Sequence, residues 1–296
     1  MGLLERLFGR SKTSGSRPAD GGQQKESGAG AEREQAREKE EPLKEAEREI
    51  SLQVGNIQGV GDREDQEDSF AVLNSADPGR LRSQGLFAMV ADGMGGMADG
   101  KAASQLTVDV FRSRFSQWEE DPFPPEWLYQ GACTASDQVF GQLGGASGTT
   151  LVAVHILENR LHWVSVGDSA IFIKRGDGVF QLNREHTYLN QLYARELEEE
   201  TIDKTRAQQD ADARRLTSFV GIDHLKEVDL NLRPWILRPG DVILLCSDGI
   251  SGVLSPPELS EGMSLKPDQG CALLETMVLE KQIPGQDNYT GVMIAC

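Results

Sequence analysis

The sequence has few aromatic residues, few cysteines and no long hydrophobic run, and each absence excludes a class of protein. No stretch of about eighteen apolar residues occurs, and the N-terminus lacks the basic, apolar and small-residue order of a secretion signal. We therefore expect neither a membrane-spanning helix nor secretion, and we expect a cytoplasmic protein. The four cysteines and four histidines are scattered, without a C-x-x-C pair, so a zinc site is not expected.

Basic residues are also scarce. The 30 Lys and Arg are outnumbered by 47 Asp and Glu, which gives a formal net charge of −17. Nucleic acid is bound by clustered Lys and Arg because its backbone is negatively charged, so no nucleic-acid partner is expected. A site for hard divalent cations, which take oxygen ligands, remains open.

Residues 1–50 differ in composition from the rest and are predicted to form a flexible charged tail. They contain many Gly, Ser, Glu and Arg and show no alternating apolar pattern after the first turns. Leu3, Leu4, Leu7 and Phe8 would share one helical face, so residues 1–10 could dock on a membrane surface or on a partner. A frayed terminus is an equally consistent interpretation, because a helix of two turns is marginal in water.

Residues 51–296 combine short apolar strands with a few long helices and are predicted to form one domain. Strands are expected at nine places, including Leu86–Ala91, Leu161–Val166, Glu227–Leu232 and Val242–Cys246. Helices are expected over Gly100–Trp118, Pro125–Leu143, Leu189–Glu199 and Pro267–Lys281. Short turns such as Glu158-Asn159 indicate antiparallel pairing. The expected class is α+β, with antiparallel sheets covered by helix pairs.

Carboxylates recur beside glycine where apolar strands end. Three strands run directly into Asp92-Gly93, Gly167-Asp168 and Ser247-Asp248, and Asp287-Asn288 precedes the last strand. Hard divalent cations need oxygen ligands, and a two-metal site needs carboxylates that reach both ions. Four aspartates could supply such a cage: Asp68, Asp92, Asp248 and Asp287. Such a centre lowers the pKa of a bound water and holds it in line with a phosphorus atom.

Two further residues suit the same chemistry. Gly93 lets the backbone bend after Asp92, so that its carbonyl can also face a metal. An arginine fork suits phosphate oxygens better than a lysine does, and Arg63 lies five residues before Asp68. Taken singly, each motif also has an ordinary explanation, since an Asp-Gly pair is more often a turn than a ligand. The argument depends on their joint order.

That joint order resembles the metal-dependent protein phosphatase family, PPM or type 2C, in its bacterial form. The resemblance covers about residues 52–296 and depends on a collinear series of motifs. The series comprises Arg63, Glu67-Asp68, the Asp-Gly-Met-Gly-Gly loop at 92–96, Gly148-Thr149-Thr150, Gly167-Asp168-Ser169, Arg238-Pro239-Gly240-Asp241, Ser247-Asp248-Gly249 and Asp287-Asn288.

The resemblance implies a four-layer α-β-β-α sandwich of two antiparallel sheets flanked by helix pairs. It implies two Mg²⁺ or Mn²⁺ ions, bridged by Asp92 with the Gly93 carbonyl. Asp248 and Asp287 would bind one ion, and Glu67 and Asp68 would reach the other directly or through water. Asp168 would hold a weaker third metal, Arg63 would grip the phosphoryl group, and residues 189–215 would form a flap beside the cleft.

The implied activity is hydrolysis of phosphoserine and phosphothreonine on proteins by a metal-activated water. The implied partners are phosphoprotein substrates and an opposing serine/threonine kinase, and the protein is expected to be a monomer. Three positions depart from the family pattern: Met97 replaces a frequent histidine, Lys101 a frequent glutamate and Ala170 a frequent arginine. Two alternatives stay open, a folded module that binds phosphoproteins without turnover and an enzyme for small phosphoesters.

Overall fold

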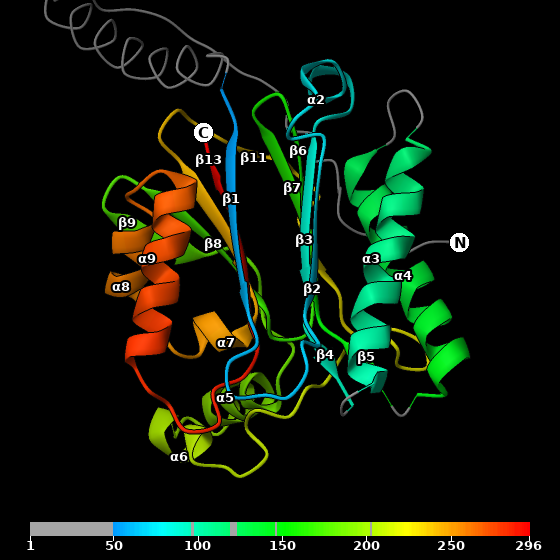
Figure 1. The fold of residues 1–296 in the computed structure, drawn as a ribbon. Helices are drawn as coiled ribbons and strands as arrows, with labels where there is room; N and C mark the ends of the chain where they lie inside the picture. Colours follow the sequence, from blue (N-terminus) through cyan, green and yellow to red (C-terminus); the bar gives the residue numbers. More distant parts are fainter. Residues whose placement is uncertain (1–49, 96–97, 119–122, 146, 202) are drawn as a thin grey trace, which may run out of the picture. The chain divides into compact units, whose positions relative to one another are not determined.

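The computed structural model describes residues 50–95, 98–118, 123–145, 147–201 and 203–296 of the chain. In this part, two antiparallel sheets lie face to face and helices cover both outer faces (Figure 1). The expected α+β class and the four-layer sandwich are confirmed. The predicted tail, with its N-terminal segment 1–10, lies outside the described residues apart from position 50, and so does Met97. The division into tail and domain stays a prediction.

One sheet contains both ends of the described domain. Its strand order is β1 (Gln53–Gly59), β13 (Tyr289–Ala295), β12 (Val242–Cys246), β8 (Ala170–Arg175) and β9 (Gly178–Gln181). All neighbouring pairs are antiparallel, and Gly59 faces Tyr289 at the end of β1. The loop after β1 and the loop before β13 therefore lie at the same end of this sheet.

The other sheet is built around β3. Its strand order is β10 (Asp229–Leu230), β7 (Arg160–Val166), β6 (Leu151–Leu157), β3 (Leu86–Ala91) and β2 (Ser69–Leu73), and β11 (Trp235–Ile236) also pairs with β7. The turn at Glu158-Asn159 joins β6 to β7 as an antiparallel hairpin, as expected. A short ribbon of β4 (Gly93–Met94) and β5 (Gly148–Thr149) extends beyond β3.

Helices form the two outer layers. Helices α3 (Ala98–Ser116) and α4 (Pro124–Leu143) cover the sheet of β3, and α8 (Pro256–Gly262) and α9 (Pro267–Glu280) cover the sheet of β12 (Figure 1). Four further helices complete the described part: α2 (Pro78–Gln84), α5 (Tyr188–Glu198), α6 (Lys204–Gln208) and α7 (Asp248–Ser251).

The central strands are buried on both faces, which explains their continuous apolar sequences. In β3, Phe87 and Met89 pack toward α3 and α4, whereas Val90 packs between the sheets. In β12, Leu244 faces α9 and Ile243 faces the other sheet. Each sheet therefore has an inner core on one face, shared with the other sheet, and an outer core on the other face, shared with its helices.

The strand directions place all the predicted carboxylates at one end of the sandwich. Strands β3 and β7 are both antiparallel to β6, so they run the same way and both end where Asp92 and Asp168 follow. Strand β12 ends at Ser247-Asp248, and its antiparallel neighbour β13 begins after Asp287. Figure 1 shows α7 and the β4–β5 ribbon at this end.

Candidate active site

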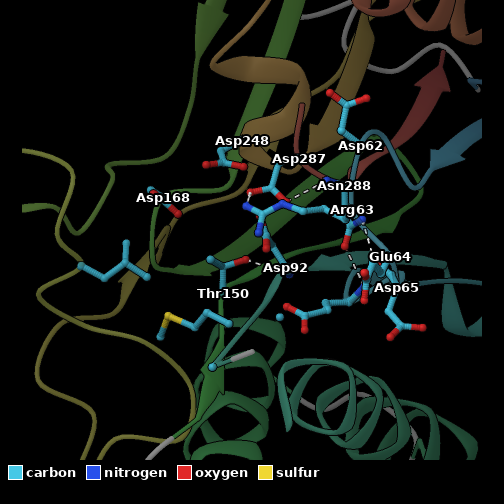
Figure 2. A pocket seen from close by; sticks show the side chains of 15 residues that line it. Asp62, Arg63, Glu64, Asp65, Asp92, Thr150, Asp168, Asp248, Asp287 and Asn288 are labelled. Atoms are coloured by element: carbon cyan, nitrogen blue, oxygen red, sulfur yellow. Dashed lines mark hydrogen bonds and ion pairs between the residues drawn. The ribbon is translucent and has the colours of Figure 1, made fainter. Parts of the chain in front are cut away.

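A cleft of about 630 Å³ opens at this end of the sandwich (Figure 2). Eight carboxylates and one arginine are among its lining residues, which are Asp62, Arg63, Glu64, Asp65, Glu67, Asp92, Gly93, Met94, Gly95, Thr150, Asp168, Leu216, Asp248, Asp287 and Asn288. All the predicted site residues line it except Asp68. Segments far apart in sequence thus supply one acidic surface.

Asp92 is fixed in place through its backbone. Its N–H donates to Thr150 Oγ1 at 3.0 Å, and its carbonyl accepts hydrogen bonds from Thr150 N and Thr149 Oγ1, each at 2.8 Å. Thr150 Oγ1 lies 2.6 Å from Ser169 Oγ, next to Asp168. These bonds fix the backbone of Asp92 relative to the loop that carries Asp168, and Asp92 itself lines the cleft.

Gly93 is required by close packing. A Cβ atom at this position would lie 2.3 Å from the carbonyl oxygen of Gly100 and 2.6 Å from that of Glu67. Any side chain would therefore separate α3 from the loop that carries Glu67. The Ser104 hydroxyl on α3 donates to the same Glu67 carbonyl at 2.5 Å, which ties this loop to the helix.

Asp68 lies behind the wall of the cleft. Its side chain is buried, and Oδ2 accepts a hydrogen bond from Ser247 Oγ at 2.8 Å. Its Oδ1 is buried and has no hydrogen-bond partner among the described residues. Burial raises the pKa of Asp68 to about 6, although hydrogen bonds from Thr290 and Ser247 oppose the shift.

Asn288 organises the acidic loop between β1 and β2, and sequence reasoning gave it no role of its own. Its Oδ1 accepts from Glu67 N at 2.7 Å, and its Nδ2 donates to the carbonyls of Val60 (2.9 Å) and Asp65 (3.1 Å). Only an amide offers both an acceptor and two donors in one short side chain. The sequence signal that could have identified Asn288 was its position directly after Asp287.

Arg63 lines the cleft and forms an ion pair with a predicted metal ligand. Its Nη2 lies 2.6 Å from Asp287 Oδ2, and both side chains are exposed. Figure 2 shows its guanidinium group between Asp287 and Asp92, with Asp168 and Asp248 on the side away from Glu64 and Asp65. The arginine is therefore placed within the predicted catalytic site.

The crowded carboxylates favour their protonated forms. Burial, and then the negative charges of Asp68 and Asp248, raise the pKa of Asp92 well above its usual value. Burial and the charge of Asp248 raise the pKa of Asp168 to about 7. Burial and the charge of Asp287 raise the pKa of Asp248. Such repulsion is relieved by a proton or by a cation.

The donor set fits hard divalent cations. The anionic side chains that line the cleft are all carboxylates, and carboxylate oxygens are the ligand type that Mg²⁺ and Mn²⁺ prefer. The orphaned Oδ1 of Asp68 also suits a bound ion or its water. Among the described residues no three Asp, Glu, His or Cys side chains yet enclose a single point, and Asp287 is engaged by Arg63.

Residues 189–215 directly precede Leu216, which lines the cleft, and they fold into a small helical unit. Helices α5 and α6 pack around Leu192, Ala207 and Ala213. The chain closes on itself through hydrogen bonds from Leu189 N to Ala213 O (2.9 Å) and from Tyr188 N to Arg215 O (2.9 Å). Leu216, directly after this unit, lines the cleft. Its function as a flap stays a prediction.

A carboxylate-rich cleft at one end of two packed sheets, with an arginine directed into it, is typical of a metal-dependent hydrolase of phosphate esters. The sequence model described as protein phosphatase 2C matches residues 66–278. The chain belongs to the protein phosphatase 2C family and is a metal-dependent serine/threonine phosphatase.

Curated relatives and solved structures agree with this assignment. The serine/threonine phosphatase stp of Listeria innocua is 26% identical over 215 residues, which cover 70% of this chain and 82% of the relative. The serine/threonine protein phosphatase PstP of Mycobacterium tuberculosis is 30% identical over 215 residues, 69% of this chain and 39% of the relative.

A crystal structure of the catalytic domain of PstP in complex with two manganese ions is similar in fold. It is 25% identical to this chain with a TM-score of 0.62, and the match covers 82% of this chain and 97% of that one. No helix in the described part of the present chain has the length and apolarity needed to cross a membrane.

Proposed function

We propose that this phosphatase works by a two-metal mechanism and opposes a serine/threonine kinase on shared phosphoprotein substrates. The observation that supports the mechanism is the convergence of Asp92, Asp168, Asp248 and Asp287 on one cleft, where burial and mutual repulsion favour cation binding. The manganese complex of the PstP catalytic domain supports two ions of this kind.

The proposed ligand assignment follows the sequence prediction. Asp92 and the Gly93 carbonyl would serve both ions, and Asp248 with Asp287 would complete one of them. Glu67 would complete the other at the cleft, and the buried Asp68 would act through a water or through its unpartnered Oδ1. Asp168 would hold a weaker third ion. Bound divalent cations supply a nucleophilic water of lowered pKa and neutralise charge on the phosphoryl group.

The residues of the chain have distinct tasks in this proposal. Arg63 would leave Asp287 and bind the phosphoryl oxygens through charge-assisted hydrogen bonds. Asp287 would thereby become available as a ligand. Thr150 and Asn288 would maintain the positions of Asp92 and of the Glu67 loop through the hydrogen bonds described above. These side chains orient the reacting groups without taking part in bond breaking.

Release of phosphate from a phosphothreonine peptide tests the activity, and Mn²⁺ titration by calorimetry tests the metal site separately. We expect release with Mn²⁺ or Mg²⁺, its loss with EDTA, and a stoichiometry of at least two ions. Binding of a phosphopeptide without release at ~1 mM Mn²⁺, in excess of ordinary affinities for such sites, would instead favour a non-catalytic binding module.

A further inference from the structure

A second groove, of about 460 Å³, opens beside the catalytic cleft and shares Asp62 with it. It lies between the end of β1, the last turn of α9 and the loop that leads to β13. We call it the α9 groove and define it by Val60, Asp62, Leu279, Ile283, Pro284 and Tyr289. None of these residues is among the predicted site residues.

Three of the exposed large apolar side chains of the described residues lie together in this groove. Leu279 is 54% exposed, Val60 40% and Ile283 39%, and the three meet in this one groove. Gathered apolar surface of this kind marks a binding site more often than single exposed residues do. The side chains therefore offer a contact to an apolar group from another molecule.

The floor of the groove is preformed. Tyr289 lies across β1, because a Cβ atom on Gly59 would come within 2.0 Å of the tyrosine Cζ. The Tyr289 hydroxyl donates to Glu275 Oε1 on α9 at 3.1 Å, so the ring is held from both sides. A rigid aromatic floor can accept an apolar side chain without a large ordering cost.

The groove adjoins the catalytic cleft, and the two are lined by neighbouring residues of the same two hydrogen-bonded loops. Asp62 N donates to Gln286 O at 2.8 Å, and Asp62 Oδ2 accepts from Gly285 N at 2.9 Å. Gln286 lines the groove, and the next residue, Asp287, lines the cleft. An extended peptide advances about 3.3–3.6 Å per residue, so a segment with its phosphorylated residue in the cleft reaches the groove within a few positions.

We propose that the α9 groove is a substrate subsite that binds an apolar side chain a few residues from the phosphorylated one. This inference rests on the proposed catalytic function of the neighbouring cleft. Charge narrows the substrate class further, because Asp62, Glu64 and Asp65 line that cleft and are not assigned to the proposed metal ions. The favoured substrates are phosphothreonine or phosphoserine segments that carry an aliphatic anchor together with basic residues.

The test uses the full chain and a series of phosphothreonine peptides. One leucine is placed at successive positions on either side of the phosphothreonine in a Lys- and Ala-containing peptide, and kcat and KM are measured for each. We expect one position to lower KM by roughly tenfold relative to alanine, as expected for a largely buried leucine. The kcat values should remain similar.

Variants of the groove identify the subsite. Leu279→Glu and Ile283→Glu should abolish the advantage of the leucine peptide and leave p-nitrophenyl phosphate turnover unchanged. Leu265→Glu is the matched control, because Leu265 is 41% exposed just before the other end of α9. Unchanged p-nitrophenyl phosphate turnover also shows that the variants fold.

Three results would overturn the inference and leave the proposed function intact. They are an active enzyme with no preferred leucine position, a preference that survives both groove variants, and inhibition by a synthetic peptide of residues 1–10 that Leu279→Glu abolishes. The last result would assign the groove to the chain's own N-terminal segment. Absence of turnover with every substrate would instead contradict the proposed mechanism itself.

Discussion

Arg63 and Asp287 form an ion pair in the cleft, with 2.6 Å between Nη2 and Oδ2, although each suits a different ligand. The two side chains are 56% and 45% exposed, and exposed ion pairs contribute only about 0–1 kcal/mol to stability. The pair is therefore easily exchanged. In the proposed mechanism, the phosphoryl group would bind Arg63 and a cation would bind Asp287, so the ion pair would hold both side chains in place until substrate and metal bind.

Arg63→Ala is expected to weaken substrate capture. Loss of a charge-assisted hydrogen bond to the phosphoryl group should cost about 1.5–3 kcal/mol in kcat/KM. KM should rise more than kcat falls if the arginine holds ground state and transition state alike. Steady-state kinetics on a phosphothreonine peptide provide the measurement. The thermal midpoint should hardly move, and an unchanged kcat/KM would show that Arg63 is only a surface residue.

Asp92→Asn and Asp248→Asn are each expected to reduce turnover by at least ~10²-fold, comparable with removal of a strong electrostatic catalytic group. Each change removes a carboxylate from the proposed metal cage and retains the shape of the side chain. Mn²⁺ calorimetry should show weaker binding in parallel. Asp177→Asn, in the exposed turn between β8 and β9, is the control. Full activity of either site variant at saturating metal would remove that residue from the site.

Asp168→Asn is expected to stabilise the metal-free protein at neutral and alkaline pH. The pKa of Asp168 is raised from 3.8 to about 7 in the fold, chiefly by burial. The folded protein therefore binds this proton more tightly than the unfolded chain, and the associated stability is full below the unfolded pKa and is lost as pH rises through about 7. The variant should exceed the wild type by ~1–3 kcal/mol near pH 8 and match it near pH 4.

Thermal unfolding with EDTA, followed by circular dichroism across this pH range, measures that difference. Buried His155 acts in the opposite direction, because burial lowers its pKa to about 4 and stability is lost as pH falls from 6.5 toward that value. His155 is present in both proteins, so its effect cancels in the comparison. A difference between the two proteins that does not change with pH would show that Asp168 is not held in a charge-disfavouring environment.

Asn288→Ala is expected to loosen the acidic loop and to lower both stability and activity. The change leaves Glu67 N, Val60 O and Asp65 O without their shared partner, at a cost of about 2–3 kcal/mol in the free energy of unfolding. Asn288→Asp retains an acceptor for Glu67 N but loses both donors. The rate of hydrogen–deuterium exchange in residues 60–68 should therefore lie between those of the wild type and of Asn288→Ala. Equal exchange in all three proteins would contradict the organising role of Asn288.

The strands buried on both faces were the easiest elements to predict. The apolar runs Leu86–Ala91 and Val242–Cys246 coincide with β3 and β12. The strand expected over Glu227–Leu232 is only two residues long, at Asp229–Leu230, and β9 and β11 were not expected. Strands β10 and β11 are two residues long and depend on pairing with β7, which is far away in the sequence, and β9 is a four-residue edge strand, so their local patterns carry little information.

The sequence also predicted which carboxylates lie together in the candidate site, but not the contacts that hold them in place. Strand-end position brought Asp92, Asp168, Asp248 and Asp287 to one cleft, because the strands that precede or follow them share an end of the sandwich. The burial of Asp68 behind Ser247 and the three bonds of Asn288 depend on tertiary contacts between residues more than 170 positions apart. No local pattern reports such contacts.

The carboxylates of the cleft come from both sheets, since Asp92 follows β3 and Asp248 follows β12. The two strands are kept apart by the inner core, where Val90 and Ile243 pack. On the proposed ligand assignment, the thickness of that apolar layer would help to set the distance that a cation between Asp92 and Asp248 must span. Selectivity between ions of different radius would then depend partly on buried residues that do not touch the metal, such as Val90 and Ile243, and exchanging one of these aliphatic side chains for another would change it.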